Sequence, residues 1–248
     1  MKNVLIFGIY GKMGLRLIDA IEKDDLLRVV AGVDVRSGKI GDVNVYSDVS
    51  SVTENIDVII DFSRPSSLDS ILSFALGKNI PAVLCTTGYS EEELLKIDEA
   101  AKSVPVFISA NMSQGISLLA KLSKIAAKTL DGFDIEIVEA HHNKKVDAPS
   151  GTAVLLANEI IGEKSELFID TDRTNERKAR DKNEIGISSV RGGSIVGEHE
   201  VMFIGENEIV TIRHSALSRS VFADGAIKAA KFVLGKSSGK YDMKDITG

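Results

Sequence analysis

The sequence is poor in cysteine, in positive charge and in long hydrophobic runs, and each shortage excludes a class of protein. A single cysteine, Cys85, cannot form an internal disulfide or a multi-thiolate metal centre. We therefore expect a reducing, cytoplasmic location. Thirty Lys and Arg residues against 36 Asp and Glu residues give a net charge of -6, so no overall positive field attracts nucleic acid or anionic lipid. No segment reaches the roughly 20 apolar residues of a membrane span, and neither nucleic acid nor a membrane is an expected partner.

Length and composition indicate a packed protein with two modest domains. The chain has 248 residues, of which 44% are hydrophobic and 27% are charged, whereas disordered chains are more polar. One minimal core needs fewer residues and three domains need more. The apolar stretch at residues 4–10 lacks the small-residue cleavage site of a secretory signal, so we expect an unprocessed chain.

The first 110 residues have the pattern of an α/β domain. A short apolar run, a turn rich in Gly, Ser or Thr and a segment with helical spacing follow one another repeatedly. The apolar runs are continuous, which predicts strands covered by helices on both faces. The predicted strands are Val4–Phe7, Leu27–Val33, Val58–Ile60, Ala82–Leu84 and Val106–Ile108. A capping box at Ser90 and Glu93 predicts a further helix, and Pro65 is placed at the start of another.

After Asn111 the pattern changes to that of a mixed sheet with one face open to solvent. Residues 115–130 have the spacing of an amphipathic helix, and residues 133–139 alternate as a strand does. Residues 201–204 and 209–212 predict a hairpin around a turn. The polar stretch 162–182 is interpreted as a solvated mobile loop, with closure over a ligand as the alternative. A last amphipathic helix over residues 221–234 is close enough to the end to pack back on the first domain.

A glycine-rich turn follows the first predicted strand and precedes a helical run. Its residues are Gly8, Ile9, Tyr10, Gly11, Lys12, Met13 and Gly14. Gly11 would let the backbone approach a pyrophosphate, and Gly14 would let the helix pack closely on the strand. The usual dinucleotide fingerprint has its first glycine one residue later than Gly8, so this is a variant. An ordinary strand-to-helix turn is the alternative interpretation.

Three further segments favour a dinucleotide. Asp34 ends the second apolar run, where a carboxylate can accept hydrogen bonds from the adenosine ribose. Arg36 and Lys39 follow and could accept a 2′-phosphate, so NADH and NADPH both remain open. Two turns at the carboxyl ends of strands suit a nicotinamide carboxamide; their residues are Cys85, Thr86 and Thr87, and Ser109, Ala110, Asn111 and Met112. We interpret Cys85 itself as a buried small hydrophobe and not as a nucleophile.

The second half contains a cluster of histidine and lysine residues. His141, His142, Lys144 and Lys145 follow the strand at 133–139, and Ser150, Gly151 and Thr152 open the next helical run. A helix start is a cradle for anions, and Lys145 adds a full positive charge. With no third histidine and no cysteine nearby, we expect no metal. A solvated basic loop beside a capped helix is the alternative.

Together these motifs resemble the dihydrodipicolinate reductases of the diaminopimelate and lysine pathway. The residues that carry the resemblance are Gly8-x-x-Gly11-Lys12-Met13-Gly14, Asp61–Pro65, Thr86–Gly88, Glu139–Thr152, Arg191–His199 and Tyr241–Asp245. The resemblance covers nearly the whole chain, and the histidine block is its most specific part. It implies an α/β fold in which a Rossmann dinucleotide-binding domain, residues 1–112 plus 218–248, carries an inserted α+β mixed-sheet domain, residues 113–217, for substrate binding and oligomerisation.

The resemblance also implies an activity and residue roles. The reaction would be reduction of 4-hydroxy-tetrahydrodipicolinate to tetrahydrodipicolinate with NADH or NADPH, in a homotetramer. His141 corresponds to the acid/base residue of the family and Lys145 to its proton donor. His142, Ser150, Gly151 and Thr152 form the implied binding site for a small dicarboxylate substrate. The glycine turn, Asp34 and the two later turns correspond to cofactor contacts.

Two other interpretations remain at this point. Another Rossmann dehydrogenase acting on a small carboxylate substrate would explain residues 1–112 equally well, but it has no use for a dianion site at residues 141–152. A nicotinamide-nucleotide sensor without catalysis would keep the glycine turn and Asp34, but it would not need His141 and Lys145 beside an anion site.

Overall fold

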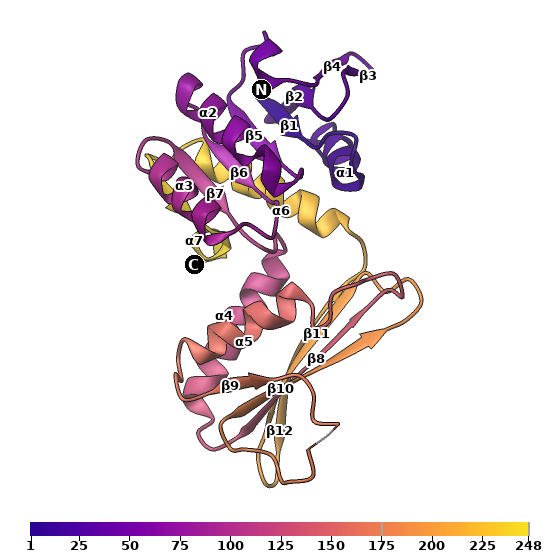
Figure 1. The fold of residues 1–248 in the computed structure, drawn as a ribbon, viewed down its shortest axis with the longest axis vertical. Helices are drawn as coiled ribbons and strands as arrows, with labels where there is room; N and C mark the ends of the chain where they lie inside the picture. The colour runs from indigo at the N-terminus through magenta and orange to yellow at the C-terminus, as the bar shows by residue number, and fades with distance from the viewer. Residues whose placement is uncertain (175, 248) are drawn as a thin grey trace. The chain divides into compact units, whose positions relative to one another are not determined.

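The computed structural model describes residues 1–174 and 176–247, which form two compact units (Figure 1). Unit 1 comprises Met1–Gln114 and the chain from Arg219 onward, and unit 2 comprises Gly115–Ser218. This division lies close to the boundaries expected from the sequence, after residues 112 and 217. Within residues 1–174 and 176–247, no helix is long and apolar enough to cross a membrane.

Unit 1 is built on an eight-stranded sheet of order β13-β7-β6-β5-β1-β2-β4-β3. All neighbouring strands are parallel except β3 and β4, which form an antiparallel edge. The strands are β1 (Lys2–Phe7), β2 (Leu27–Val33), β3 (Gly38–Ile40), β4 (Val43–Tyr46), β5 (Val58–Asp61), β6 (Ala82–Leu84), β7 (Pro105–Ile108) and β13 (Gly239–Tyr241). The five strands predicted from continuous apolar runs are confirmed. The short strands β3, β4 and β13 at the edges were not predicted.

Helices cover both faces of this sheet. They are α1 (Lys12–Ile21), α2 (Leu68–Lys78), α3 (Glu91–Ala101), α6 (Ser220–Val233) and α7 (Met243–Thr247), with 3-10 turns at Val49–Ser51 and Pro65–Ser67. Residues of α1 and α6 pack on one face, and residues of α2 and α3 on the other (Figure 1). This is the doubly wound arrangement that the continuous apolar strands predicted. Ser90 caps α3 with the predicted capping box, whereas Pro65 begins a 3-10 turn and α2 begins only at Leu68.

Unit 2 is a five-stranded sheet of order β12-β11-β8-β10-β9 with two helices on one face. Its elements are α4 (Gln114–Thr129), β8 (Asp134–His141), α5 (Gly151–Ile161), β9 (Phe168–Asp170), β10 (Glu184–Arg191), β11 (Gly197–Ile204) and β12 (Ile209–Ala216). Strands β8, β9 and β10 are parallel, while β11 is antiparallel to β8 and to β12. The predicted hairpin is confirmed, because Ile204 pairs with Ile209.

The interpretation of residues 162–182 as loop throughout is wrong at Phe168–Asp170. These three residues pair with Glu184–Gly186 of β10 as a short parallel edge strand. The strand was missed because three residues are too few to show an alternation, and its pairing partner lies farther along the chain. Strand β10 itself was not predicted either.

Helix α6 returns to unit 1 through an unusually close backbone contact. A Cβ atom at Gly225 would lie 1.8 Å from the carbonyl oxygen of Met112, which no real Cβ contact tolerates. Met112 ends the predicted cofactor turn at residues 109–112, and its side chain is buried in the core with α1 and α6. Glycine at 225 therefore sets the distance between α6 and this turn.

We predict that Gly225→Ala lowers the free energy of unfolding by about 2 kcal/mol, because the obstacle is backbone and one of the two elements must shift. Gly77→Ala is the matched control, since Gly77 lies on α2 with no atom within 4 Å of its Cβ position. In Gly77→Ala the free energy of unfolding should stay unchanged or rise by up to about 1 kcal/mol. Urea denaturation followed by circular dichroism measures both. Equal stability of the two variants would mean that the contact is easily relieved.

Candidate active site

The glycine turn between β1 and α1 is closed by backbone contacts that leave no room for side chains. Gly8 has φ of 77°, and a Cβ there would lie 2.6 Å from the carbonyl oxygen of Phe62. A Cβ at Gly14 would lie 2.4 Å from the carbonyl oxygen of Gly8. The variant spacing therefore keeps both structural glycines, one for the left-handed turn and one for close packing of α1.

Asp34 joins this turn directly. Its Oδ2 accepts a hydrogen bond from the backbone N–H of Tyr10 at 2.8 Å, and its Oδ1 accepts one from the N–H of Val35 at 2.8 Å. The guanidinium of Arg36 lies over the Tyr10 ring, with Cζ 5.1 Å from the centroid. The carboxylate is thus held in place at the end of β2, with lone pairs left for further donors.

A cavity of about 700 Å³ opens beside these residues. Its lining includes Gly8, Tyr10, Gly11, Asp34 and Arg36, which the sequence pattern singled out. It also includes Ser63, Arg64, Ser66 and Ser67. Ser63 and Arg64 belong to a motif of the family resemblance, but no role was predicted from the sequence for any of the four. Among the predicted turn residues, Ile9 is fully buried while Lys12 is exposed. Any contact of Ile9 with a ligand must therefore be made by its backbone.

A buried carboxylate, Asp61, connects the turns that follow β5 and β6. Asp61 Oδ1 accepts hydrogen bonds from the backbone N–H and the hydroxyl of Ser63, and Oδ2 accepts one from the Tyr89 hydroxyl at 3.2 Å. Burial raises the pKa of Asp61, and these hydrogen bonds oppose the rise. Burial and the nearby Asp61 raise the pKa of the Cys85 thiol well above its ordinary value. Cys85 therefore stays a neutral thiol.

The other predicted cofactor residues lie at the carboxyl ends of β6 and β7. Thr86 is buried at the end of β6, whereas Thr87 is exposed. In the second turn, the Ser109 hydroxyl donates to the carbonyl of Asn111 at 2.8 Å, while Ala110 is exposed. Both turns are thus at the edge of the sheet where ligands of open α/β sheets bind.

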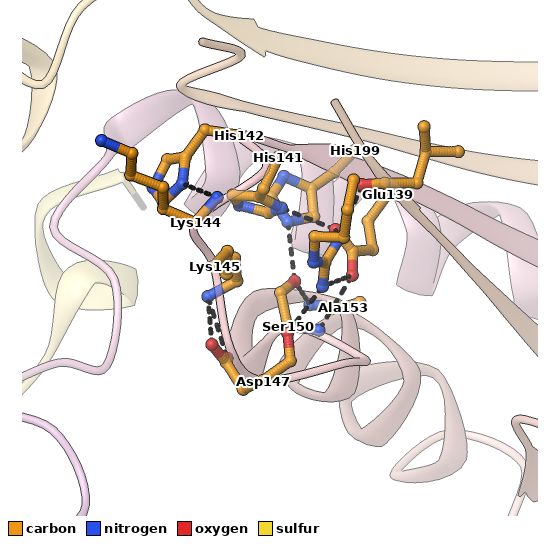
Figure 2. Close-up of polar contacts among 11 residues, drawn as sticks. Glu139, His141, His142, Lys144, Lys145, Asp147, Ser150, Ala153 and His199 are labelled. Atoms are coloured by element: carbon orange, nitrogen blue, oxygen red, sulfur yellow. Dashed lines mark hydrogen bonds and ion pairs between the residues drawn. The ribbon is translucent and has the colours of Figure 1, made fainter. Parts of the chain in front are cut away.

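In unit 2, the alternation of β8 places Glu139 and His141 on the face that the helices cover. His141 is 9% exposed, and its Nδ1 lies 2.6 Å from Glu139 Oε2. The Glu139 carboxylate is completely buried and receives both terminal nitrogens of Arg191, at 2.8 and 2.6 Å. Figure 2 shows Glu139 and His141 together with Ser150, whose backbone N–H donates to Glu139 Oε1 at 3.1 Å.

The charges of this cluster determine which ring nitrogen of His141 carries the proton. Burial works to raise the pKa of Glu139, but hydrogen bonds from Arg191, Ser189 and His141 lower it to about 2. Glu139 is therefore ionised and can only accept, so the proton of neutral His141 resides on Nδ1. Burial lowers the pKa of His141, and the hydrogen bond and charge of Glu139 oppose that effect. Nε2 is consequently the nitrogen that gains and loses a proton.

His199 and the start of α5 complete the cluster. The Ser150 hydroxyl accepts from the N–H of Ala153 at 3.2 Å and so caps α5, and it also lies 3.2 Å from His199 Nε2. Burial lowers the pKa of His199 to about 4, so this ring is neutral. The rings of His141 and His199 meet edge to face with centroids 5.2 Å apart. The capped helix begins at Gly151 and Thr152, whose N–H groups belong to its first turn.

The remaining predicted residues lie around this cluster (Figure 2). His142 is half-buried, and its Nδ1 accepts from the N–H of Lys144 at 3.2 Å. Lys145 Nζ is held by both oxygens of the exposed Asp147, each at 2.8 Å. That ion pair lowers the pKa of Asp147. In the described part of the chain, no three His, Cys, Asp or Glu residues gather in a way that could hold a metal ion.

Sequence reasoning assigned no role to Glu139, Arg191 or His199, although all three lie in motifs that carry the resemblance. Glu139 could have been found, because residues two apart on a strand share a face with each other and His141 was already a candidate. Arg191 and His199 come from β10 and β11, and only the sheet pairing brings them to β8.

A doubly wound domain of the dinucleotide-binding type, joined to a mixed-sheet domain with a buried histidine paired to a carboxylate, is the architecture of a Rossmann-class oxidoreductase. Comparison with known proteins identifies the family. The family models described as dihydrodipicolinate reductase, N-terminus, and dihydrodipicolinate reductase, C-terminus, match residues 2–112 and 115–247. The chain therefore belongs to the dihydrodipicolinate reductase family, which acts in diaminopimelate and lysine biosynthesis and uses NADH or NADPH.

Individual relatives agree with this assignment. A 4-hydroxy-tetrahydrodipicolinate reductase of Clostridium novyi is 49% identical over 247 residues, which cover 99% of this chain and 98% of the relative. One of Caldanaerobacter subterraneus is 49% identical over 249 residues, with the same coverage. A dipicolinate-bound dihydrodipicolinate reductase from Paenisporosarcina is 27% identical and superposes with a TM-score of 0.83 over 99% of each chain.

These findings confirm the family, the fold class, the reductase activity and the NAD(P)H cofactor expected from the sequence. They do not favour either alternative interpretation, because both halves match one reductase family across almost the whole chain.

The buried Glu139 carboxylate should make the free energy of unfolding depend on pH. Its pKa is lowered from 4.5 to about 2 in the folded chain, so its stabilising effect is full above pH 4.5 and is lost as the pH falls toward 2. We expect the difference in unfolding free energy between wild type and Glu139→Gln to shrink over this interval. Urea denaturation between pH 6 and pH 3 measures it, with the exposed Glu206→Gln as control. A difference that does not change with pH would contradict the ionised, paired state of Glu139.

Proposed function

We propose that this chain reduces 4-hydroxy-tetrahydrodipicolinate to tetrahydrodipicolinate, with the cofactor bound by unit 1 and the substrate by unit 2. The observation that carries the proposal is the Glu139–His141 pair at 2.6 Å beside the capped start of α5. An acid/base group and an anion cradle on one side of a sheet fit a reaction in which a dianionic substrate must be protonated. The dipicolinate bound to the Paenisporosarcina relative supports a dicarboxylate ligand.

The proposed cofactor contacts are those of the turns at the carboxyl edge of the sheet. They comprise Gly8, Ile9, Tyr10, Gly11, Lys12, Met13, Gly14, Asp34, Cys85, Thr86, Thr87, Ser109, Ala110, Asn111 and Met112. The residues fit a dinucleotide because glycine at 8 and 14 closes the turn and the start of α1 is free to donate to a pyrophosphate. When bound, the reduced nicotinamide supplies the hydride.

The proposed substrate contacts neutralise two carboxylates. The N–H groups of Gly151 and Thr152 at the start of α5 donate to one of them, and Ser150 holds that helix end in place. Lys145 supplies the positive charge once it exchanges Asp147 for the substrate, which is possible because Asp147 is exposed. His142, half-buried and next to His141, contributes a further donor.

Proton transfer is assigned to His141 and Lys145. Hydride addition to an unsaturated imine places an electron pair on the ring, and a positioned acid must supply the proton. Glu139 holds the imidazole by Nδ1, so His141 exchanges protons with the substrate or water through Nε2. Lys145 carries protons to donate as well as charge.

A test of His141 separates catalysis from binding. His141→Gln keeps much of the side-chain size but cannot transfer a proton, so we expect kcat to fall by roughly 10²–10⁴-fold with little change in substrate KM. His142→Gln, one residue beyond the end of β8, should instead raise KM. NADH titration should give wild-type affinity in both variants, because the cofactor turns belong to unit 1. A His141→Gln enzyme that keeps more than about a tenth of wild-type kcat would contradict the assignment.

Cofactor preference follows from Asp34. Its carboxylate is anchored by two backbone N–H groups, so it cannot swing away from a 2′-phosphate, and Arg36 is stacked on Tyr10. We predict that NADH is at least competitive with NADPH. Steady-state kcat/KM values with each cofactor decide this. A preference for NADPH of more than about a hundredfold would show that neighbouring cations outweigh Asp34.

The open face of the unit 2 sheet supports a homotetramer, and the single cysteine supports a cytoplasmic location. Half-buried or exposed apolar residues lie on this face among charged ones, including Val138, Val190, Met202 and Ile204. A second copy of the chain could bury them. Sedimentation velocity should give about four times the mass of one chain, 26.7 kDa, and a monomer at assay concentrations would refute the proposal.

A further inference from the structure

The start of β11 lies directly against the reactive side of His141. Glu198 pairs with Ala140 across the antiparallel β8–β11 ladder, so the next position along, Gly197, faces His141. A Cβ atom at Gly197 would lie 3.1 Å from His141 Nε2 and 3.5 Å from its Cδ2. Gly197 therefore provides space at the one imidazole nitrogen that Glu139 does not occupy.

The backbone conformation does not require glycine at position 197. Gly197 is not among the glycines with positive φ, so an L-residue is compatible with its conformation. Gly192, in the turn between β10 and β11, also lacks positive φ, and a Cβ there would meet no atom within 4 Å. Gly192 contacts His141 through its backbone alone, because its N–H donates to the His141 carbonyl at 2.9 Å. Only the Cβ position of Gly197 faces the imidazole ring.

The same strand also contributes the neighbouring ring of His199, two residues along on the same face. The charged groups around His141 are Glu139 on β8, Arg191 on β10 and Lys145 in the segment before α5. Ser150 at the start of α5 carries no charge. The β11 wall is neutral, because burial lowers the pKa of His199 to about 4. Glu139 thus holds the Nδ1 side of the ring, while Nε2 faces the bare backbone of Gly197.

We propose that Gly197 is a positioning residue for proton transfer: its missing side chain keeps Nε2 of His141 open to the substrate or to a water molecule. This inference rests on the proposed acid/base role of His141. A methyl group at 197 would push the imidazole away from its Glu139-held position and would remove solvent from Nε2. Catalytic groups must be held within about 0.5 Å of their productive geometry, so a small displacement slows the reaction.

The test compares Gly197→Ala with Gly192→Ala in the full-length protein. In Gly197→Ala we expect kcat to fall about tenfold or more, and the pKa of His141, followed by NMR of its ring protons, to fall by about half a unit because its charged form loses water. NADH affinity and the thermal transition should stay close to wild type. Gly192→Ala should match wild type in all four measurements.

A double-mutant cycle with His199→Ala tests the steric cause. Removing the His199 ring leaves room into which the imidazole can retreat, so Gly197→Ala should reduce kcat less in that background than in wild type. This comparison also serves if Gly197→Ala alone folds poorly, because the second change relieves the crowding. Equal effects of Gly197→Ala in both backgrounds would overturn the steric account.

Two outcomes separate this inference from the proposed function. If Gly197→Ala changes neither kcat nor the pKa of His141, the inference is wrong and the proposed function is untouched. If the pKa of His141 changes while kcat does not, His141 is not the acid/base group, and both the inference and the role proposed for His141 are overturned.

Discussion

The structure of unit 2 depends on one buried carboxylate, that of Glu139. Removing a carboxylate from water is costly unless donors surround it, and here Arg191, His141 and the Ser150 N–H all donate to it. These donors come from β10, from β8 itself and from the start of α5. The same ion therefore joins two strands to a helix end and selects the His141 tautomer. Loss of this one charge would disturb the packing and the chemistry together.

Unit 1 depends on a different constraint, the close approach of backbone to backbone. Gly8 against Phe62, Gly14 against Gly8 and Gly225 against Met112 are contacts that any side chain would block. At the same end of the sheet, Asp34 and Asp61 join neighbouring turns by accepting hydrogen bonds from Tyr10 and Tyr89. This end of unit 1 is thus shaped by the absence of side chains.

Both kinds of constraint, a buried carboxylate and a missing side chain, act on His141 within unit 2. His141 is held on one side by an ionised hydrogen-bond partner and is left free on the other by a residue without a side chain. An imidazole buried to this extent would be a poor catalyst if its second nitrogen were also enclosed. The neutral His199 ring limits rotation without adding charge. Orientation and access are therefore supplied by different strands of the same sheet.

The sequence by itself determined the features that depend on neighbouring residues: the continuous apolar strands of unit 1, the capping box at Ser90, the glycine turn and the histidine–lysine cluster. Its motifs also determined the family. Only the tertiary structure decided what depends on pairing between distant segments, such as β9 against β10, Arg191 against Glu139, and Gly197 against His141. The physical reason is that helices and strands follow from the spacing of apolar residues along a short segment. The register of a mixed sheet depends instead on packing of the whole buried face.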